Sequence, residues 1–128
     1  MFQALRNCLA ERGVSTFLQT PRQLVVSSSL PNLPTSNSFW VACHEGAWYL
    51  STWLPAIYRI PPDQDVCEVC SGVLASSDRA VYTVAKEYVR KYELTRLSGK
   101  QTDALLMSLF RKPRKERRKG AKPRLNRS

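Results

Sequence analysis

The sequence predicts an α+β fold, in which a small, mostly antiparallel sheet with a central hairpin is covered by N-terminal and C-terminal helices. Strand-like segments cluster between residues 15 and 60, and segments of helical spacing lie on either side of them. The connections within the strand region are too short for the crossover helices of a parallel sheet. At 128 residues and 43% hydrophobic, the chain has material for one core. We expect a single domain over residues 1–112 and a disordered polybasic tail over residues 113–128.

The first quarter of the chain predicts one helix and two strands. Apolar side chains recur at helical spacing over residues 2–12, and Gly13 follows as a natural helix end. The segments Ser15–Thr20 and Gln23–Ser27 are rich in strand-forming residues and flank a proline-marked turn. Residues 28–38, SSLPNLPTSNS, have the composition of a loop.

The clearest element is the stretch SFWVACHEGAWYLSTW, residues 38–53. Two aromatic and β-branched runs flank residues 44–47, and Gly46 can adopt a positive φ, so the stretch predicts a β-hairpin. A third strand is expected over residues 56–60, ended by two prolines.

Helical spacing returns in the second half of the chain. The segment PPDQDVCEVCSGVLAS, residues 61–76, has an apolar stripe and acidic residues at its start. Residues 78–92 repeat this spacing, although residues 80–84 could instead form a short strand. Residues 98–101, SGKQ, match a capping box that opens a last helix, which Pro113 should stop or kink.

The start of the chain lacks the uninterrupted apolar run and cleavage site of a signal peptide. No run approaches the roughly 18 apolar residues that a membrane helix needs. These features favour a soluble, cytoplasmic protein with no membrane partner. In that compartment the four cysteines are expected to be free thiols.

The pair Cys67 and Cys70 forms a CxxC motif with three interpretations. A redox pair is disfavoured because the preceding acidic residues would raise the thiol pKa. A zinc site would need two further ligands, from Cys43 and His44 or from Cys8. The favoured interpretation is packing, since Cys70 falls on the apolar stripe of its helix. We therefore expect no metal and no cofactor.

Residues that could support catalysis are few. His44 and Glu45 are adjacent at the tip of the expected hairpin, where a general base has no pocket and no orienting partner. The serine runs lack a nucleophile motif, and none of the five glycines forms a phosphate-cradling loop. The sequence therefore predicts a protein that is not an enzyme.

Three tryptophans, Trp40, Trp48 and Trp53, lie within fourteen residues. On a sheet such residues could stack nucleobases, but platforms of that kind are usually interleaved with Lys or Arg, and residues 38–58 contain none. Core packing or protein contact is the favoured interpretation. Strand alternation puts Trp40 and Ala42 on one face and Phe39, Val41 and Cys43 on the other.

The charge lies almost entirely at the C-terminal end. Residues 111–128, RKPRKERRKGAKPRLNRS, hold ten of the 20 Lys and Arg residues and one of the ten acids, a net +9 that leaves +1 for residues 1–110. Such an arm can follow phosphates by charge alone. The predicted nucleic-acid-binding residues are Arg111, Lys112, Arg114, Lys115, Arg117, Arg118, Lys119, Lys122, Arg124 and Arg127.

The string FWVACHEGAWYLSTW, followed by YRIPPDQDVCEVC, resembles small uncharacterised bacterial α+β proteins, some of them similar in pattern to the immunity proteins of toxin systems. The resemblance covers residues 15–110 and does not include the basic tail. It implies a protein-binding module and not an enzyme, and it offers no catalytic residues to carry over.

Two functions are therefore expected from the sequence. The first is a nucleic-acid-associated accessory protein, with a folded body and a cationic arm that contacts RNA or DNA without strong sequence preference. The alternative is a protein-binding module of immunity or adaptor type, in which the tail has no dedicated partner. The tail favours the first function.

Overall fold

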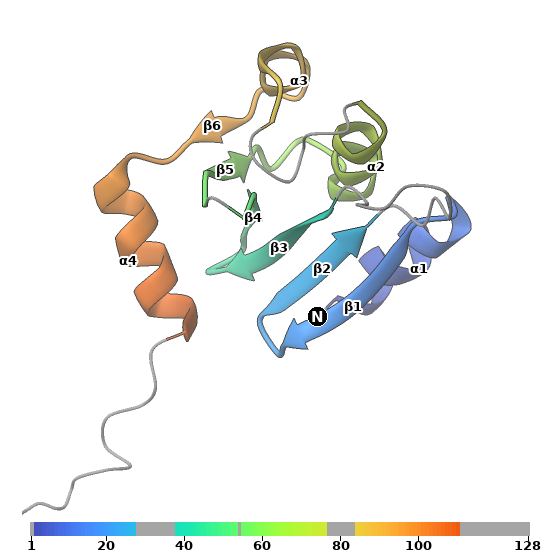
Figure 1. The fold of residues 1–128 in the computed structure, drawn as a ribbon, viewed down its shortest axis with the longest axis horizontal. Helices are drawn as coiled ribbons and strands as arrows, with labels where there is room; N and C mark the ends of the chain where they lie inside the picture. Colours follow the sequence, from blue (N-terminus) through green and yellow to red (C-terminus); the bar gives the residue numbers. More distant parts are fainter. Residues whose placement is uncertain (1, 28–37, 54, 77–83, 111–128) are drawn as a thin grey trace, which may run out of the picture.

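The computed structural model describes residues 2–27, 38–53, 55–76 and 84–110. Within them the chain forms a six-stranded sheet and four helices, so the predicted α+β class is confirmed (Figure 1). Every pairing is antiparallel, and the strands lie in chain order, β1-β2-β3-β4-β5-β6. The predicted hairpin therefore occupies the centre of the sheet. The predicted loop over residues 28–37 and the domain boundary after residue 112 lie outside the described residues.

The strands are β1 (Ser15–Thr20), β2 (Gln23–Ser27), β3 (Ser38–His44), β4 (Ala47–Ser51), β5 (Ile57–Ile60) and β6 (Thr95–Arg96). The helices are α1 (Gln3–Glu11), α2 (Val66–Ser76), α3 (Lys86–Lys91) and α4 (Gly99–Phe110).

The predicted positions of the first helix and of the first five strands are confirmed, with differences at the ends. The hairpin loop is shorter than the four residues expected, because His44 and Ala47 pair with each other and leave only Glu45 and Gly46 in the turn. Gly13, with φ 78°, ends α1 as predicted: the Val14 N–H donates to the Leu9 carbonyl at 2.9 Å.

The segment before the last helix differs from prediction. A helix was expected over residues 78–92, but α3 covers only Lys86–Lys91, and Ala85 before it is extended, with φ −61° and ψ 144°. Residues 77–83, and with them most of the alternative strand, lie outside the described part of the chain. Strand β6 was not predicted, because its two residues are too few to show alternation.

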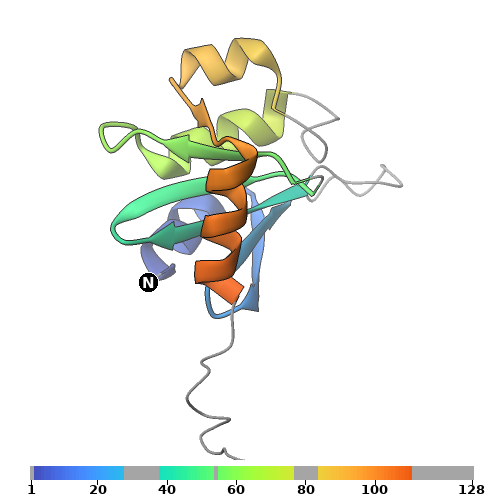
Figure 2. The same cartoon turned by 90° about the vertical axis from the view of Figure 1, so that its left-hand side faces the viewer.

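The first core lies between the sheet and the helices α1 and α2 (Figure 2). Alternate residues of β2 to β5 face it, among them Leu24, Phe39, Leu50 and Ile60. The predicted stripe of α2 meets them with Val69, Cys70, Val73 and Leu74, all buried. Burial of these apolar side chains accounts for the position of both helices against this face.

Polar contacts tie the helices on this face to one another. The Arg12 guanidinium donates to the Glu68 carboxylate at 3.1 Å, and the Tyr92 hydroxyl donates to the same carboxylate at 3.4 Å. Burial, and then the negative charge of Glu68, raise the pKa of Tyr92, so the phenol keeps its proton and remains the donor. The end of α1, the helix α2 and the end of α3 are thereby connected.

The expectation of four free thiols is wrong for two cysteines. Cys8 of α1 and Cys67 of α2 form a disulfide, with their Cα atoms 6.3 Å apart. No local pattern indicates this pair, because 59 positions separate the two residues and the packing of α1 against α2 brings them together. Cys43 and Cys70 are free.

The second core lies on the opposite face of the sheet, beneath α4 (Figures 1 and 2). Leu105 and Leu109 are buried against Val25, Trp40 and Ile57. Helices thus cover both faces of the antiparallel sheet, and α4 covers the second face.

Candidate functional site

The predicted binding residues follow α4 directly. All ten, from Arg111 to Arg127, lie outside the described residues, so the structure places none of them relative to another. It does place the helix that carries them. The site can therefore be built from α4 and the part of the sheet beneath it.

The last turn of α4 is fixed against the sheet by apolar contacts. Leu109 is buried, and the Phe110 ring meets the Trp40 ring edge-on, with centroids 5.8 Å apart. Phe110 is nevertheless 41% exposed, so the apolar face of this helix is only partly covered at its end. These contacts hold the last turn of α4 next to the centre of the sheet.

A cation of the folded body also contacts the last turn of α4. Arg22, in the turn between β1 and β2, donates from Nη1 to the Ser108 carbonyl at 3.0 Å. Carbonyls of the last helical turn lack partners within the helix and carry negative partial charge, which a guanidinium satisfies. Sequence analysis missed Arg22 because 86 positions separate it from its acceptor.

The start of α4 is set by the predicted capping box, which is confirmed. The Gln101 N–H donates to Ser98 Oγ at 3.1 Å, and the Ser98 N–H donates to Gln101 Oε1 at 2.9 Å. The reciprocal bonds fix the first turn of the helix beside strands β4 to β6.

A hollow of about 340 Å³ lies between this turn and the sheet; we call it the Arg59 hollow. Its lining is Tyr49, Arg59, Thr95, Leu97, Gln101, Ala104 and Leu105. Tyr49 of β4 and Arg59 of β5 are direct partners across the two strands, so their side chains lie on the same face, the face that α4 covers. An aromatic ring and a cation are thus neighbours on the sheet.

The pairing of Tyr49 with Arg59 was missed although a signal exists. A three-residue connection between Thr52 and Ala56 would set Ser51 opposite Ile57 and hence Tyr49 opposite Arg59, as observed. Arg59 lies one position beyond residues 38–58, the aromatic stretch that contains no Lys or Arg.

A second hollow, of about 270 Å³, lies on another side of the start of α4. Its lining includes one cation and one acid, Arg96 and Asp103. Opposite charges in one hollow give no preference for either an anion or a cation, so this hollow is a weaker candidate than the Arg59 hollow.

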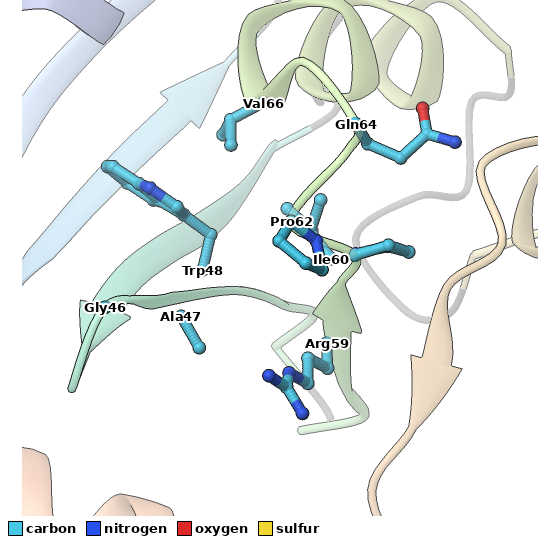
Figure 3. Close-up of a pocket in the computed structure, with 9 residues that line it drawn as sticks. Gly46, Ala47, Trp48, Arg59, Ile60, Pro62, Gln64 and Val66 are labelled. Carbon is cyan, nitrogen blue, oxygen red and sulfur yellow. The ribbon is translucent and has the colours of Figure 1, made fainter.

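A small hollow lies beside the central hairpin, between β4 and the segment leading to α2 (Figure 3). Trp48 and Val66 lie on one side of it and Arg59 on another, next to Ala47. Its volume is about 60 Å³, room for a few water molecules but not for a substrate.

His44 and Glu45 lie at the hairpin tip, as predicted. His44 Nε2 is 3.7 Å from a Glu45 carboxylate oxygen, and the Glu45 side chain is 85% exposed. Neither residue lines any of the three hollows. The pair is a contact between neighbours in a polar turn, which matches the interpretation favoured from the sequence.

The three tryptophans do not form one surface. Trp40 is buried beneath α4, whereas Trp48 packs against the opposite core, with its ring edge-on to Phe2 at 5.8 Å. Trp53 is 40% exposed at the end of the sheet and donates from Nε1 to Ser38 Oγ at 3.0 Å. Packing is therefore the main role of Trp40 and Trp48, and the three rings cannot make a shared stacking platform.

The cysteine chemistry is separate from α4. Cys70 is buried, as predicted, and desolvation, with a further contribution from Asp65, raises the pKa of its thiol to about 12. A protonated, buried thiol is a poor nucleophile, so Cys70 is unsuited to attack the disulfide of Cys67. Among the described residues there is no group of three or more His, Cys, Asp or Glu side chains that could hold a metal ion.

Comparison with known proteins adds no assignment: no family model, no curated protein and no solved structure matches the chain. Among the described residues, no helix is both long enough and apolar enough to cross a bilayer. The fold and the site together define an antiparallel α+β body whose C-terminal helix leads into a strongly basic segment.

Proposed function

We propose that this protein is a non-enzymatic, nucleic-acid-associated accessory protein whose residues 111–128 contact the phosphates of RNA or DNA. One observation carries the proposal: these 18 residues hold a net charge of +9, while the rest of the chain holds +1. A net charge of roughly 2 to 8 is enough to keep a small domain soluble, so solubility alone does not account for such a concentration.

The attachment of the segment supports the proposal. It follows Phe110, which contacts Trp40 at the centre of the sheet, and Arg22 adds a cation at the Ser108 carbonyl nearby. Eighteen residues reach at most about 60 Å when extended. Because residues 111–128 follow α4 directly, the folded body would remain within that distance of any duplex or single strand that these residues contact.

The test compares two variants that lose the same charge. Arg117, Arg118 and Lys119 are replaced by Gln in one, and Lys86, Arg90 and Lys91 of the exposed surface of α3 in the other. Fluorescence anisotropy with unrelated duplex DNAs and a structured RNA should show binding weakened roughly tenfold or more by the first set, through loss of about three phosphate contacts.

The α3 variant should bind as the original protein does. If both variants lose affinity equally, net charge rather than the arm governs binding. If the full-length protein binds neither nucleic acid below about 100 μM at physiological salt, the upper end of non-specific DNA affinities, the proposal is wrong.

We place this activity in the cytoplasm, as the sequence favours. In a reducing compartment Cys8 and Cys67 would be held as thiols, because the glutathione and thioredoxin systems reduce most disulfides there. Alkylation of thiols in intact cells, followed by mass spectrometry, should find both cysteines modified. Finding them protected as a disulfide would contradict the cytoplasmic location.

A second candidate, the protein-binding module, is favoured by the exposed edge of the sheet. Among the described strands, β1 pairs only with β2; it contains no charged residue or proline, and it exposes Phe17 and Leu18 by 54% and 46%. Such an edge can accept a strand from another protein. A protein that still copurifies after nuclease treatment, and that no longer copurifies with the Thr16→Lys variant, would favour the protein-binding module over the nucleic-acid-associated function.

A further inference from the structure

The described residues that line the Arg59 hollow include several hydrogen-bond donors and no acidic side chain. The ion pairs between described residues are Arg12–Glu68 and His44–Glu45, so Arg59 takes part in neither. An arginine without a carboxylate, on an exposed strand position, presents a planar fork of donors suited to a phosphate or carboxylate. The hollow therefore favours an anionic ligand.

Three further residues with donor groups line the same hollow. Gln101 uses its carbonyl oxygen in the capping box, at 2.9 Å from the Ser98 nitrogen, which leaves its amide NH₂ group to donate. Tyr49 and Thr95 contribute hydroxyl groups that form no hydrogen bond with another described residue. A phosphate has enough oxygens to accept from several of these groups at once.

The remaining lining is apolar. Leu97, Ala104, Leu105 and the ring of Tyr49 provide a surface for a flat, weakly polar group. The volume of about 340 Å³ lies within the range of roughly 300 to 1,000 Å³ that is usual for small-molecule sites. A nucleotide combines these two features, an anionic phosphate and a planar base.

We propose that the Arg59 hollow receives one nucleotide of a single-stranded stretch, with its phosphate at Arg59 and its base against Tyr49. Bases of a single strand are free to leave the stack and to lie on an aromatic side chain, whereas those of a duplex are not. The inference rests on the proposed function, to which it adds a preferred form of nucleic acid and a contact in the folded body.

The distance from the hollow to the end of α4 agrees with this. Gln101 and Phe110 are nine residues apart on α4, about 14 Å at roughly 1.5 Å per residue. One strand could thus place a nucleotide in the hollow while the arm contacts neighbouring phosphates.

The experiment is an NMR titration of the full-length, ¹⁵N-labelled protein with hexathymidylate. We expect amide shifts at Thr95, Leu97 and Gln101 as well as in residues 111–128. Shifts confined to residues 111–128 would overturn this inference and leave the proposed function standing. Shifts at the hollow alone would support the inference and contradict the role of the arm. If no amide shifts, both are wrong.

Two further ligands show whether a shift at the hollow requires a single strand or only an anion. A short duplex should shift residues 111–128 and leave Thr95 and Gln101 unchanged; equal shifts there would overturn the preference for a single strand. Inorganic phosphate at the same concentration should have little effect at the hollow. If phosphate alone reproduces the hexathymidylate shifts, the site takes an isolated anion and the inference is wrong.

Substitutions of Arg59 and Tyr49 test the proposed contacts to the phosphate and to the base, respectively. Arg59→Gln should weaken hexathymidylate binding about tenfold, by loss of a charge-assisted contact. Arg90→Gln, on the exposed face of α3, removes the same charge elsewhere and should have little effect. Tyr49→Phe should retain most of the affinity, and Tyr49→Leu should lose roughly fivefold or more. Equal affinities of Arg59→Gln and Arg90→Gln, both with unchanged melting temperatures, would overturn the proposal.

Discussion

The turn between β3 and β4 contains two residues of positive φ, Glu45 at 52° and Gly46 at 80°. A two-residue hairpin turn with positive φ at both positions is a type I′ turn, for which Asn-Gly is the preferred pair. Glu45 has no side-chain group that eases a left-handed conformation, so it is strained there.

Glu45→Asn should therefore stabilise the protein, by about 0.5 to 1 kcal/mol, because asparagine adopts this conformation at lower cost. Urea unfolding followed by tryptophan fluorescence measures the change. Glu45→Gln, which removes the charge without easing the backbone, is the matched control and should be nearly neutral. A gain from Glu45→Gln as large as that from Glu45→Asn would show that charge, and not φ, is responsible.

Gly72 of α2 lies directly beneath the Tyr92 side chain. A Cβ at Gly72 would overlap the Tyr92 hydroxyl, the group that donates to Glu68. Gly72→Ala should consequently destabilise the fold by about 1 to 3 kcal/mol, although alanine is the better helix former. Thermal or urea unfolding gives the value.

Two comparisons make this result specific. Gly99→Ala, at a helical glycine with nothing within 4 Å of a new Cβ, should be neutral or stabilising. Tyr92→Phe removes the overlapping hydroxyl, so adding it to Gly72→Ala should recover part of the loss. If the double substitution is as unstable as the sum of the single ones, the clash does not account for the effect.

The role of a residue was predictable where it follows from neighbouring positions in the sequence. It was missed where it depends on a partner that is distant in the sequence. Gly13, Gly46 and the Ser98–Gln101 box follow from backbone chemistry within a few positions, and all were confirmed. Arg22 and Cys67 depend on partners 86 and 59 positions away, which no local pattern reveals.

At the scale of elements, the strands were easier to predict than the segment that closes the sheet. The alternation of β3 and β4 placed Trp40 and Phe39 on opposite faces, and the two cores confirm it. Strand β6 consists of two residues that pair with β5 because α3 and α4 position them, so tertiary contacts and not propensity determine it.

The disulfide fixes α1 to α2 and should contribute substantially to stability. Closing a loop of 59 positions restricts the unfolded chain, and disulfides typically contribute about 2 to 4 kcal/mol. Replacing Cys8 and Cys67 by Ser should lower the free energy of unfolding by that amount, measured by urea denaturation. Cys43→Ser, at a free cysteine, is the control and should have a small effect.

Reductant provides the converse test. Dithiothreitol should destabilise the original protein by about as much as the double substitution does, and should not affect the substituted protein. An unchanged stability of the original protein in reductant would contradict a stabilising role for this bond.

For the whole molecule, the main feature is the concentration of net charge in residues 111–128 of the sequence. The described body encloses its sheet between two cores, and nearly all the net positive charge follows the end of α4. The candidate site was predictable as far as it depends on charge, since ten cations within 18 residues are visible in the sequence. The Arg59 hollow was not, because its residues come from three strands and a helix and meet only in the fold.

The salt dependence of binding tests the central claim most directly. If about five to eight cations of the arm contact phosphates of duplex DNA, log K plotted against log salt should have a slope of about −4 to −7, at −0.9 per contact. Replacing Arg114, Lys115, Arg117, Arg118 and Lys119 by Gln should flatten that slope and weaken binding similarly on unrelated sequences. An unchanged slope and affinity in the substituted protein would show that the body binds and that the arm does not.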